Sequence, residues 1–182
     1  MNLEEKTLEK KVLFEGRIIN LRRDTVLLPN GATATREVIE HPGGVCVAAL
    51  DDEDNVLMVK QFRYPYKDVI LEVPAGKRDK GGEDPLECGK RELKEETGAT
   101  AKEYFYLGEL YPSPGYCDEI IHLFAAKGLT YGETCPDEDE FVEVEKIPLD
   151  TAVQMILNGE IKDSKTQVCI LKLKALKEKG LF

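Results

Sequence analysis

The sequence predicts an α/β fold in which helices cover both faces of a mixed β-sheet, preceded by a small antiparallel β lobe. Strand-like and helix-like segments follow one another without the strict alternation that a purely parallel sheet requires. The length of 182 residues suits one such domain with a small added lobe. His41-Pro42-Gly43-Gly44 interrupts the chain after the first strand-like segments. We therefore expect an N-terminal β lobe at residues 1–42 and a main domain at residues 43–182.

The N-terminal lobe has the pattern of antiparallel strands. A polar lead-in at 1–10 comes before strand-like segments at 11–21 and 24–29, and another follows at 32–40. Asn30-Gly31 lies between the last two, and Asn-Gly between strand-like runs is a strong hairpin signal. A three-stranded lobe of this kind is too small to bury an apolar face on its own.

The main domain begins with three apolar strand-like runs at 44–50, 56–62 and 69–76. A helix is predicted over 85–97, because Asp84 suits the N-cap, Pro85 the first helical position and Gly98 the stop. Further strands are expected near 104–110, 119–126 and 141–146. Two more helices are expected near 148–158 and 164–178.

Composition excludes several classes of protein. The net charge is −10 and no basic stripe is present, so we expect no nucleic-acid partner. No apolar run approaches a membrane span and the polar N-terminus lacks a secretion signal, so we expect a cytoplasmic protein without membrane contact. The five cysteines form no CxxC pair, which favours reduced thiols over a disulfide framework or zinc site.

Three glutamates on the predicted helix are the strongest chemical signal. Glu92, Glu95 and Glu96 are spaced three and four residues apart, so their like charges share one helix face. Oxygen ligands without His or Cys suit a hard cation, Mg²⁺ or Mn²⁺. A solvated acidic face paired with nearby lysine and arginine stays open on spacing alone. The glycine-bearing loop before the helix favours the ligand site, because glycine lets the backbone approach a ligand closely.

The segment 76–99 resembles the Nudix box, Gly-x5-Glu-x7-Arg-Glu-U-x-Glu-Glu-x-Gly-U, in which U is apolar. The match runs through Gly76, Glu83, Arg91, Glu92, Leu93, Glu95, Glu96, Gly98 and Ala99. One departure is that six residues, not five, separate Gly76 from Glu83. The extra residue falls at Gly81-Gly82, where a loop absorbs an insertion at small cost.

The resemblance implies a Nudix-type α/β/α sandwich and a role for each residue of the box. Glu92, Glu95 and Glu96 would bind Mg²⁺ or Mn²⁺, with the backbone carbonyl of Ala75 as a further ligand. The glutamate and the arginine of the box, Glu83 and Arg91, are expected to form an ion pair that holds the loop against the helix.

Residues outside the box resemble the ADP-ribose pyrophosphatase branch, over residues 11–182. Arg36-Glu37-Val38 followed by His41-Pro42-Gly43 is similar to its N-terminal signature. The resemblance implies a homodimer with a swapped N-terminal lobe, in which Arg36 and Glu37 reach the partner's adenine. A surface ion pair is the alternative. Arg63 would contact the phosphate or nucleotide, unless it only lies over the sheet.

Two later segments complete the expected site. Pro114 and Gly115 resemble the mark of ADP-ribose specificity, and Glu119 would bind the terminal ribose hydroxyls. The acidic segment 136–140 reads as a solvated loop by composition and as the carrier of a mobile catalytic glutamate by resemblance. We favour Glu138 as the base and Glu140 as the residue that assists the metal, with Glu95 as the next candidate base.

The implied reaction is metal-dependent hydrolysis of the pyrophosphate bond of ADP-ribose to AMP and ribose 5-phosphate. The same chemistry on another nucleoside diphosphate derivative is the nearest alternative: a sugar nucleotide such as GDP-mannose, a dinucleoside polyphosphate or a flavin dinucleotide. A non-catalytic ADP-ribose sensor is a third interpretation, which the complete set of box carboxylates disfavours.

Overall fold

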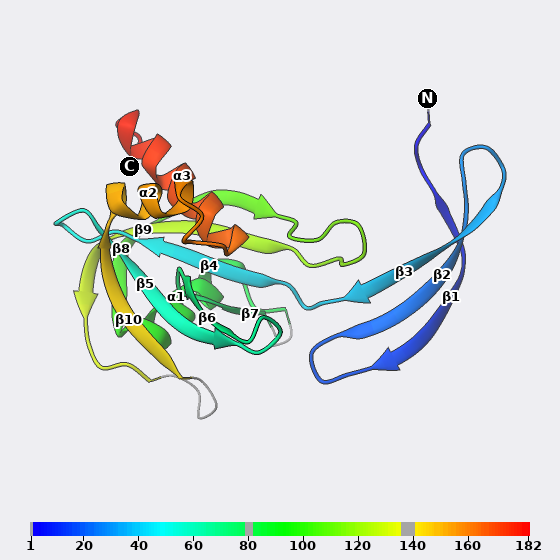
Figure 1. Cartoon of the computed structure of the whole chain (residues 1–182), viewed down its shortest axis with the longest axis horizontal. Helices are drawn as coiled ribbons and strands as arrows, with labels where there is room; N and C mark the ends of the chain where they lie inside the picture. The colour runs from blue at the N-terminus through cyan, green and yellow to red at the C-terminus, as the bar shows by residue number, and fades with distance from the viewer. Residues whose placement is uncertain (1, 79–81, 136–140) are drawn as a thin grey trace. The chain divides into compact units, whose positions relative to one another are not determined.

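The computed structural model describes residues 2–78, 82–135 and 141–182. Its contacts divide the chain into two compact units. One contains the chain up to Gly43 together with Tyr111–Ile120, and the other contains Gly44–Leu110 and Ile121–Phe182. The two units are described separately below (Figure 1).

The N-terminal unit is built on an antiparallel sheet in the order β1-β2-β3. Its strands are β1 (Lys6–Glu15), β2 (Asn20–Leu27) and β3 (Thr33–Glu40). The predicted hairpin is confirmed between β2 and β3, where Gly31 has a φ of +84° and donates to the Leu28 carbonyl at 2.9 Å. Every residue of β1 is exposed.

The start of the chain differs from the prediction, since β1 begins within the expected lead-in and the segment 11–21 is not one strand. Gly16 interrupts it with a turn in which its N–H donates to the Ile19 carbonyl at 3.0 Å. A Cβ at Gly16 would lie 2.8 Å from that same carbonyl oxygen. Only glycine therefore fits this turn.

The segment Tyr111–Ile120 joins the N-terminal unit through backbone pairing with the end of β3. Ile39 donates to the Tyr116 carbonyl at 2.7 Å and accepts from the Asp118 N–H at 3.0 Å. The bridge between Ile39 and Cys117 is parallel. The Asp118 carboxylate also accepts from the His41 N–H at 2.8 Å. These hydrogen bonds therefore join two segments of the chain that are 77 positions apart at His41 and Asp118.

The larger unit contains two sheets. A four-stranded sheet has the order β7-β4-β9-β8, and a three-stranded sheet has the order β10-β5-β6. Strands β4 (Gly44–Ala49) and β9 (Ile121–Tyr131) run parallel, whereas β7 (Ala75–Lys77) and β8 (Ala99–Leu110) pair antiparallel to them. The predicted mixed sheet is confirmed. The second sheet, of β5 (Asn55–Arg63), β6 (Asp68–Glu72) and β10 (Val142–Pro148), is antiparallel throughout.

Helices cover both faces of the four-stranded sheet, as predicted (Figure 1). The helices are α1 (Pro85–Thr97), α2 (Leu149–Leu157) and α3 (Ser164–Glu178). Side chains of the buried strand β4 alternate between them: Val45 and Val47 pack in one apolar cluster with Leu93 of α1. Cys46 and Ala48 pack in the other with residues of α3. No helix in the described part of the chain is long and apolar enough to cross a membrane.

Helix α1 begins and ends where the sequence predicts. The Asp84 carboxylate accepts from the N–H groups of Leu86 and Glu87 at 2.9 and 3.2 Å. At the other end Gly98 has a φ of +69° and donates to the Lys94 carbonyl at 2.8 Å. Strand β7 was not predicted separately, because it lies in the run 69–76. The structure ends β6 at Glu72 and pairs β7 with β4 instead.

Candidate active site

Two of the three glutamates expected to bind the metal lie almost fully buried between α1 and β7. Glu92 is 7% exposed and Glu96 is 3% exposed. The Glu96 carboxylate accepts from the Ala75 N–H at 3.1 Å. Ala75, the residue expected to offer its carbonyl to a metal, is thus joined directly to an expected metal ligand.

Gly76 makes room for the Glu92 carboxylate. A Cβ at Gly76 would lie 1.9 Å from Cδ of Glu92 and 2.0 Å from its Oε1, far inside van der Waals contact. Any other residue at this position would displace the carboxylate. The glycine that opens the box is therefore required by the close approach of β7 and α1 rather than by an unusual φ.

Arg91 links the loop before α1 to the glutamates on the helix. Its guanidinium binds both carboxylate oxygens of Glu83 at 3.2 Å, so the predicted ion pair is confirmed. Its Nη1 also lies 2.8 Å from Glu92 Oε1 and 2.7 Å from Glu95 Oε2. The hydrogen bonds with Glu83, together with the nearby Glu92 and Glu95, raise the pKa of Arg91 well above its usual value.

The carboxylates of Glu92, Glu95 and Glu96 fit a hard divalent cation, and the guanidinium of Arg91 contacts two of them. No three acidic, His or Cys side chains among the described residues form a ready metal cluster. Arg91 Nη1 lies 2.8 Å from Glu92 Oε1 and 2.7 Å from Glu95 Oε2. The donors are all oxygen, and each carboxylate has two oxygens, so it can accept from Arg91 and still offer an oxygen to a metal.

Arg63, expected to contact phosphate, is held by a carboxylate that the sequence analysis did not single out. Its Nε and Nη2 donate to the two oxygens of Glu72 at 2.6 and 2.7 Å. Arg63 is 38% exposed at its side chain, whereas Glu72 is buried. Lys165 of α3 also binds Glu72. A glutamate inside the apolar run 69–73 was the available signal, because a buried charge requires a partner.

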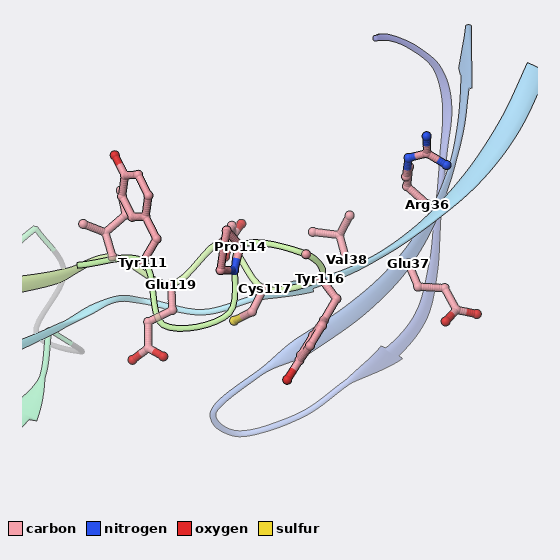
Figure 2. Close-up of a pocket in the computed structure, with 11 residues that line it drawn as sticks. Arg36, Glu37, Val38, Tyr111, Pro114, Tyr116, Cys117 and Glu119 are labelled. Atoms are coloured by element: carbon pink, nitrogen blue, oxygen red, sulfur yellow. The ribbon is translucent and has the colours of Figure 1, made fainter. Parts of the chain in front are cut away.

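The predicted substrate-binding residues other than Arg63 line a pocket of about 520 Å³ in the N-terminal unit. Arg36 and Glu37 of β3 line it together with Pro114, Gly115 and Glu119 of the segment 111–120 (Figure 2). The remaining lining residues are largely apolar or aromatic: Val38, Tyr111, Tyr116, Cys117, Asp118 and Ile120.

The side chains of Arg36 and Glu37 point to opposite sides of β3, as those of successive strand residues do (Figure 2). The Arg36 guanidinium binds Glu5 through Nε and Nη2 at 2.9 and 2.5 Å. Glu119 lies with its Oε1 3.4 Å from Nδ1 of His41. The surface ion pair considered for Arg36 therefore exists, with Glu5 rather than Glu37 as its partner.

The candidate bases Glu138 and Glu140 lie outside the described residues. The chain approaches their segment beside α1, where the Cys135 N–H donates to the Glu95 carbonyl at 2.9 Å. Glu95, the third candidate base, is more exposed than Glu92 and Glu96 and is bound by Arg91.

Comparison with known families agrees with this geometry. The model of the NUDIX domain matches residues 32–166, so the chain belongs to the Nudix family. Residues 5–39 match the N-terminal domain of nucleoside diphosphate sugar hydrolases, which defines the branch of the family more closely.

Individual relatives cover between 72% and 97% of the chain. An ADP-ribose pyrophosphatase of Bacillus subtilis is 46% identical over 93% of this chain and 92% of its own. A methanol dehydrogenase activator of Bacillus methanolicus is 46% identical over 97% of each chain. A GDP-mannose pyrophosphatase of Yersinia enterocolitica is 38% identical over 72% of this chain and 73% of its own. A crystal structure of an ADP compounds hydrolase shares the fold, with a TM-score of 0.86, 20% identity and full coverage of both chains.

Proposed function

We propose that the chain hydrolyses the pyrophosphate bond of ADP-ribose to AMP and ribose 5-phosphate. The observation that carries a hydrolase function is the placement of the Glu92 and Glu96 carboxylates against Ala75 and Gly76. ADP-ribose as the substrate is supported by the 46% identity with an ADP-ribose pyrophosphatase along nearly the full length of both chains.

Glu92, Glu95, Glu96 and the Ala75 carbonyl would hold Mg²⁺ or Mn²⁺. When bound, the metal neutralises diphosphate charge and lowers the pKa of a coordinated water. The other residues would bind and orient the substrate. Arg63 would contact the diphosphate, and Arg36 and Glu37 would bind adenine across a homodimer. Glu119, which lies beside Pro114 and Gly115, would bind the terminal ribose.

The reaction itself is balanced by one water molecule. The water oxygen forms a bond to one phosphorus while the bond from that phosphorus to the bridging oxygen breaks, leaving a phosphate on each product. We propose Glu138 as the group that takes the proton from water and Glu140 as the residue that assists the metal.

A nucleotide panel tests this function. Turnover of ADP-ribose, GDP-mannose, a diadenosine polyphosphate and flavin adenine dinucleotide would be followed by chromatography of the products. We expect the highest kcat/KM for ADP-ribose, with AMP and ribose 5-phosphate formed in equal amounts. A higher kcat/KM for GDP-mannose would replace the proposed substrate. Tight binding of ADP-ribose without any turnover would favour a sensor.

Activation of a dehydrogenase is a second candidate function. It is supported by the 46% identity with a methanol dehydrogenase activator. This identity equals the one with the ADP-ribose pyrophosphatase. Adding the chain to purified methanol dehydrogenase, with and without Mg²⁺, tests this candidate. An unchanged dehydrogenase rate would remove it.

The assignment of the base predicts different pH profiles for two variants. In Glu138→Gln we expect kcat to lose its acidic limb, because the ionising base is gone, while metal affinity stays unchanged. Glu140→Gln should instead weaken metal binding. The measurement is kcat against pH, together with metal titration of each variant. If only Glu140→Gln loses the limb, the roles are reversed, and if neither does, Glu95 becomes the first candidate.

We further propose that the protein is a homodimer with a swapped N-terminal lobe. Leu8, Val12 and Phe14 of β1 are each more than half exposed. Apolar side chains exposed along one strand are typical of a surface that another chain covers. Deleting residues 1–42 is expected to abolish dimerisation and raise KM steeply, as measured by light scattering and steady-state kinetics.

A substitution tests the dimer without removing the pairing of Ile39 with the segment 111–120. Val12→Asp combined with Phe14→Asp should shift the protein toward monomer and raise KM. Leu181→Asp, at an exposed position near the C-terminus, is the matched control and should remain dimeric. A full-length protein that is monomeric and fully active would contradict the dimer.

A further inference from the structure

A buried network of charges connects the start of α3 to Arg63. Lys165 Nζ binds the Glu72 carboxylate and also Asp163 Oδ1, the latter at 3.0 Å. Glu72 in turn binds Arg63 through both oxygens. Two positive and two negative groups therefore alternate from Arg63 to Asp163. Glu72 and Lys165 are both buried, which distinguishes this network from the surface ion pairs of the chain.

Lys165 occupies a position in the first turn of α3 where a positive charge is unfavourable. It is the second residue of α3, and a positive charge near a helix N-terminus opposes the helix dipole. It is also buried, and a buried ammonium is costly unless it is paired. Burial would lower the pKa of Lys165, but the charges of Glu72 and Asp163 outweigh that effect and raise it. The lysine therefore remains charged in an unfavourable position.

The same helix start also holds the backbone of the strand that leads to the candidate metal site. Thr166 Oγ1 accepts from the Val73 N–H at 2.9 Å, next to Glu72. The Asp163 carboxylate caps α3 by accepting from the Thr166 N–H at 2.9 Å. Val73 is followed by Pro74 and then by Ala75, whose N–H donates a hydrogen bond to the Glu96 carboxylate. The network thus borders the proposed site on one side and α3 on the other.

Arg63 is held in a way that leaves part of its guanidinium available. Glu72 occupies Nε and one N–H of Nη2, out of five N–H donors. The remaining donors have no protein partner among the residues that the structure describes. The hydrogen bonds and the charge of Glu72 raise the pKa of Arg63 against the lowering effect of burial, and the charges of Asp163 and Glu96 add smaller contributions. A diphosphate bound at the box carboxylates would need a cation at this place.

We propose that Lys165 and Glu72 are positioning residues that hold Arg63 in the orientation in which it binds the substrate diphosphate. Lys165 acts through charge: it lies between the carboxylates of Asp163 and Glu72 and keeps Glu72 ionised and directed at Arg63. This inference rests on the proposed function, in which Arg63 contacts the diphosphate.

Removing the charge of Lys165 predicts a specific defect. In Lys165→Met no cation lies between the Asp163 and Glu72 carboxylates, and their repulsion would turn Glu72 away from Arg63 or favour its protonation. Arg63 then loses its bidentate partner and its fixed orientation. Adding Asp163→Asn removes the repulsion, while the asparagine oxygen can still cap α3. Rescue by this second substitution separates a charge effect from a packing effect.

The test measures KM and kcat with ADP-ribose, and Kd for its α,β-methylene analogue, which cannot be hydrolysed at the bridge. Arg63→Met, Glu72→Gln and Lys165→Met should each raise KM and Kd about tenfold or more, because hydrogen bonds to charged groups are lost. Lys165→Met with Asp163→Asn should recover most of that loss. Lys174→Met is the control and should change neither constant, because Lys174 lies elsewhere on α3 and pairs only with Asp150 of α2 and Glu178 among the described residues.

Three outcomes would overturn the proposal. Unchanged KM and Kd in Lys165→Met would show that Arg63 does not depend on Lys165. An equal defect in the single and double variants would assign Lys165 a packing role only. An Arg63→Met variant with normal KM and Kd would show that Arg63 does not bind the diphosphate, so the network would have no substrate-binding residue to position. If Lys165→Met does not fold, Glu72→Gln and the double variant still decide between these results.

Failure of the proposed function would look different. Wild-type protein that does not turn over ADP-ribose would contradict the substrate assignment alone. The same variants could then be measured with whichever nucleotide of the panel is hydrolysed, because each candidate substrate contains a phosphate anhydride.

Discussion

Hydrolysis of ADP-ribose is expected to stop when divalent cations are removed by excess chelator and to return when Mg²⁺ or Mn²⁺ is added. The physical reason is the set of donors at the site. Glu92, Glu95 and Glu96 bring three negative charges to a diphosphate that is itself negative, and Arg91 offsets only part of this repulsion. Without a cation, substrate and site repel each other. Release of AMP would be followed with and without chelator.

A chelator already saturated with Mg²⁺ is the matched control and should leave the rate unchanged. A second readout does not depend on turnover: Mg²⁺ or Mn²⁺ should raise the melting temperature of the wild type, because a ligand that binds only the folded state stabilises it. Full activity in excess chelator would rule out the metal mechanism.

Local signals in the sequence were sufficient for the elements on which the box depends. Asp84, Pro85 and Gly98 predict the two ends of α1, and the structure confirms both. The resemblance to the Nudix box also implies the pair between Glu83 and Arg91, which the structure confirms. These features depend on contacts within about fifteen residues, where helix geometry determines which side chains meet. The mixed sheet with helices on both faces followed from the order of the elements.

Features that depend on distant parts of the chain were not predicted. The separate strand β7 exists because β4 offers a pairing edge, which no local pattern in 69–76 reveals. The attachment of 111–120 to Ile39 depends on backbone hydrogen bonds, which leave little trace in residue types. The partner of Arg36, Glu5, was missed because it lies 31 positions away along the chain. The partner of Arg63, Glu72, was missed although it is only nine positions away, since it lies on the neighbouring strand and one of many carboxylates had to be chosen.

Gly76 shows how a residue that was found by resemblance acquires a physical explanation. The sequence suggested that it belongs to the glycine-bearing loop before the helix, where glycine lets the backbone approach a ligand closely. The structure instead places it in β7, where a Cβ would overlap the Glu92 carboxylate. The requirement for glycine comes from packing between β7 and α1, the helix that follows it in the chain. Sequence identifies the position, and only the fold supplies the reason.

Glu96→Gln is expected to lower kcat by a factor on the order of 10² or more while the fold is retained. Glu96 is buried and accepts from the Ala75 N–H, and the amide oxygen of glutamine can accept the same hydrogen bond. The substitution therefore preserves local geometry and removes one charge from the expected metal site. Metal titration should show weaker binding in the variant than in the wild type.

Glu87→Gln is the matched control for this prediction, because Glu87 lies on the same helix. It is exposed and its carboxylate pairs with Lys90 at 2.6 Å, away from β7. Its kcat and metal affinity should equal those of the wild type, and both variants should melt close to the wild-type temperature. If Glu96→Gln kept its activity, the charge of Glu96 would not be needed for catalysis. The hydrogen bond from the Ala75 N–H would then hold Glu96 as a structural carboxylate. Glu92 and Glu95 would remain as the charged metal ligands.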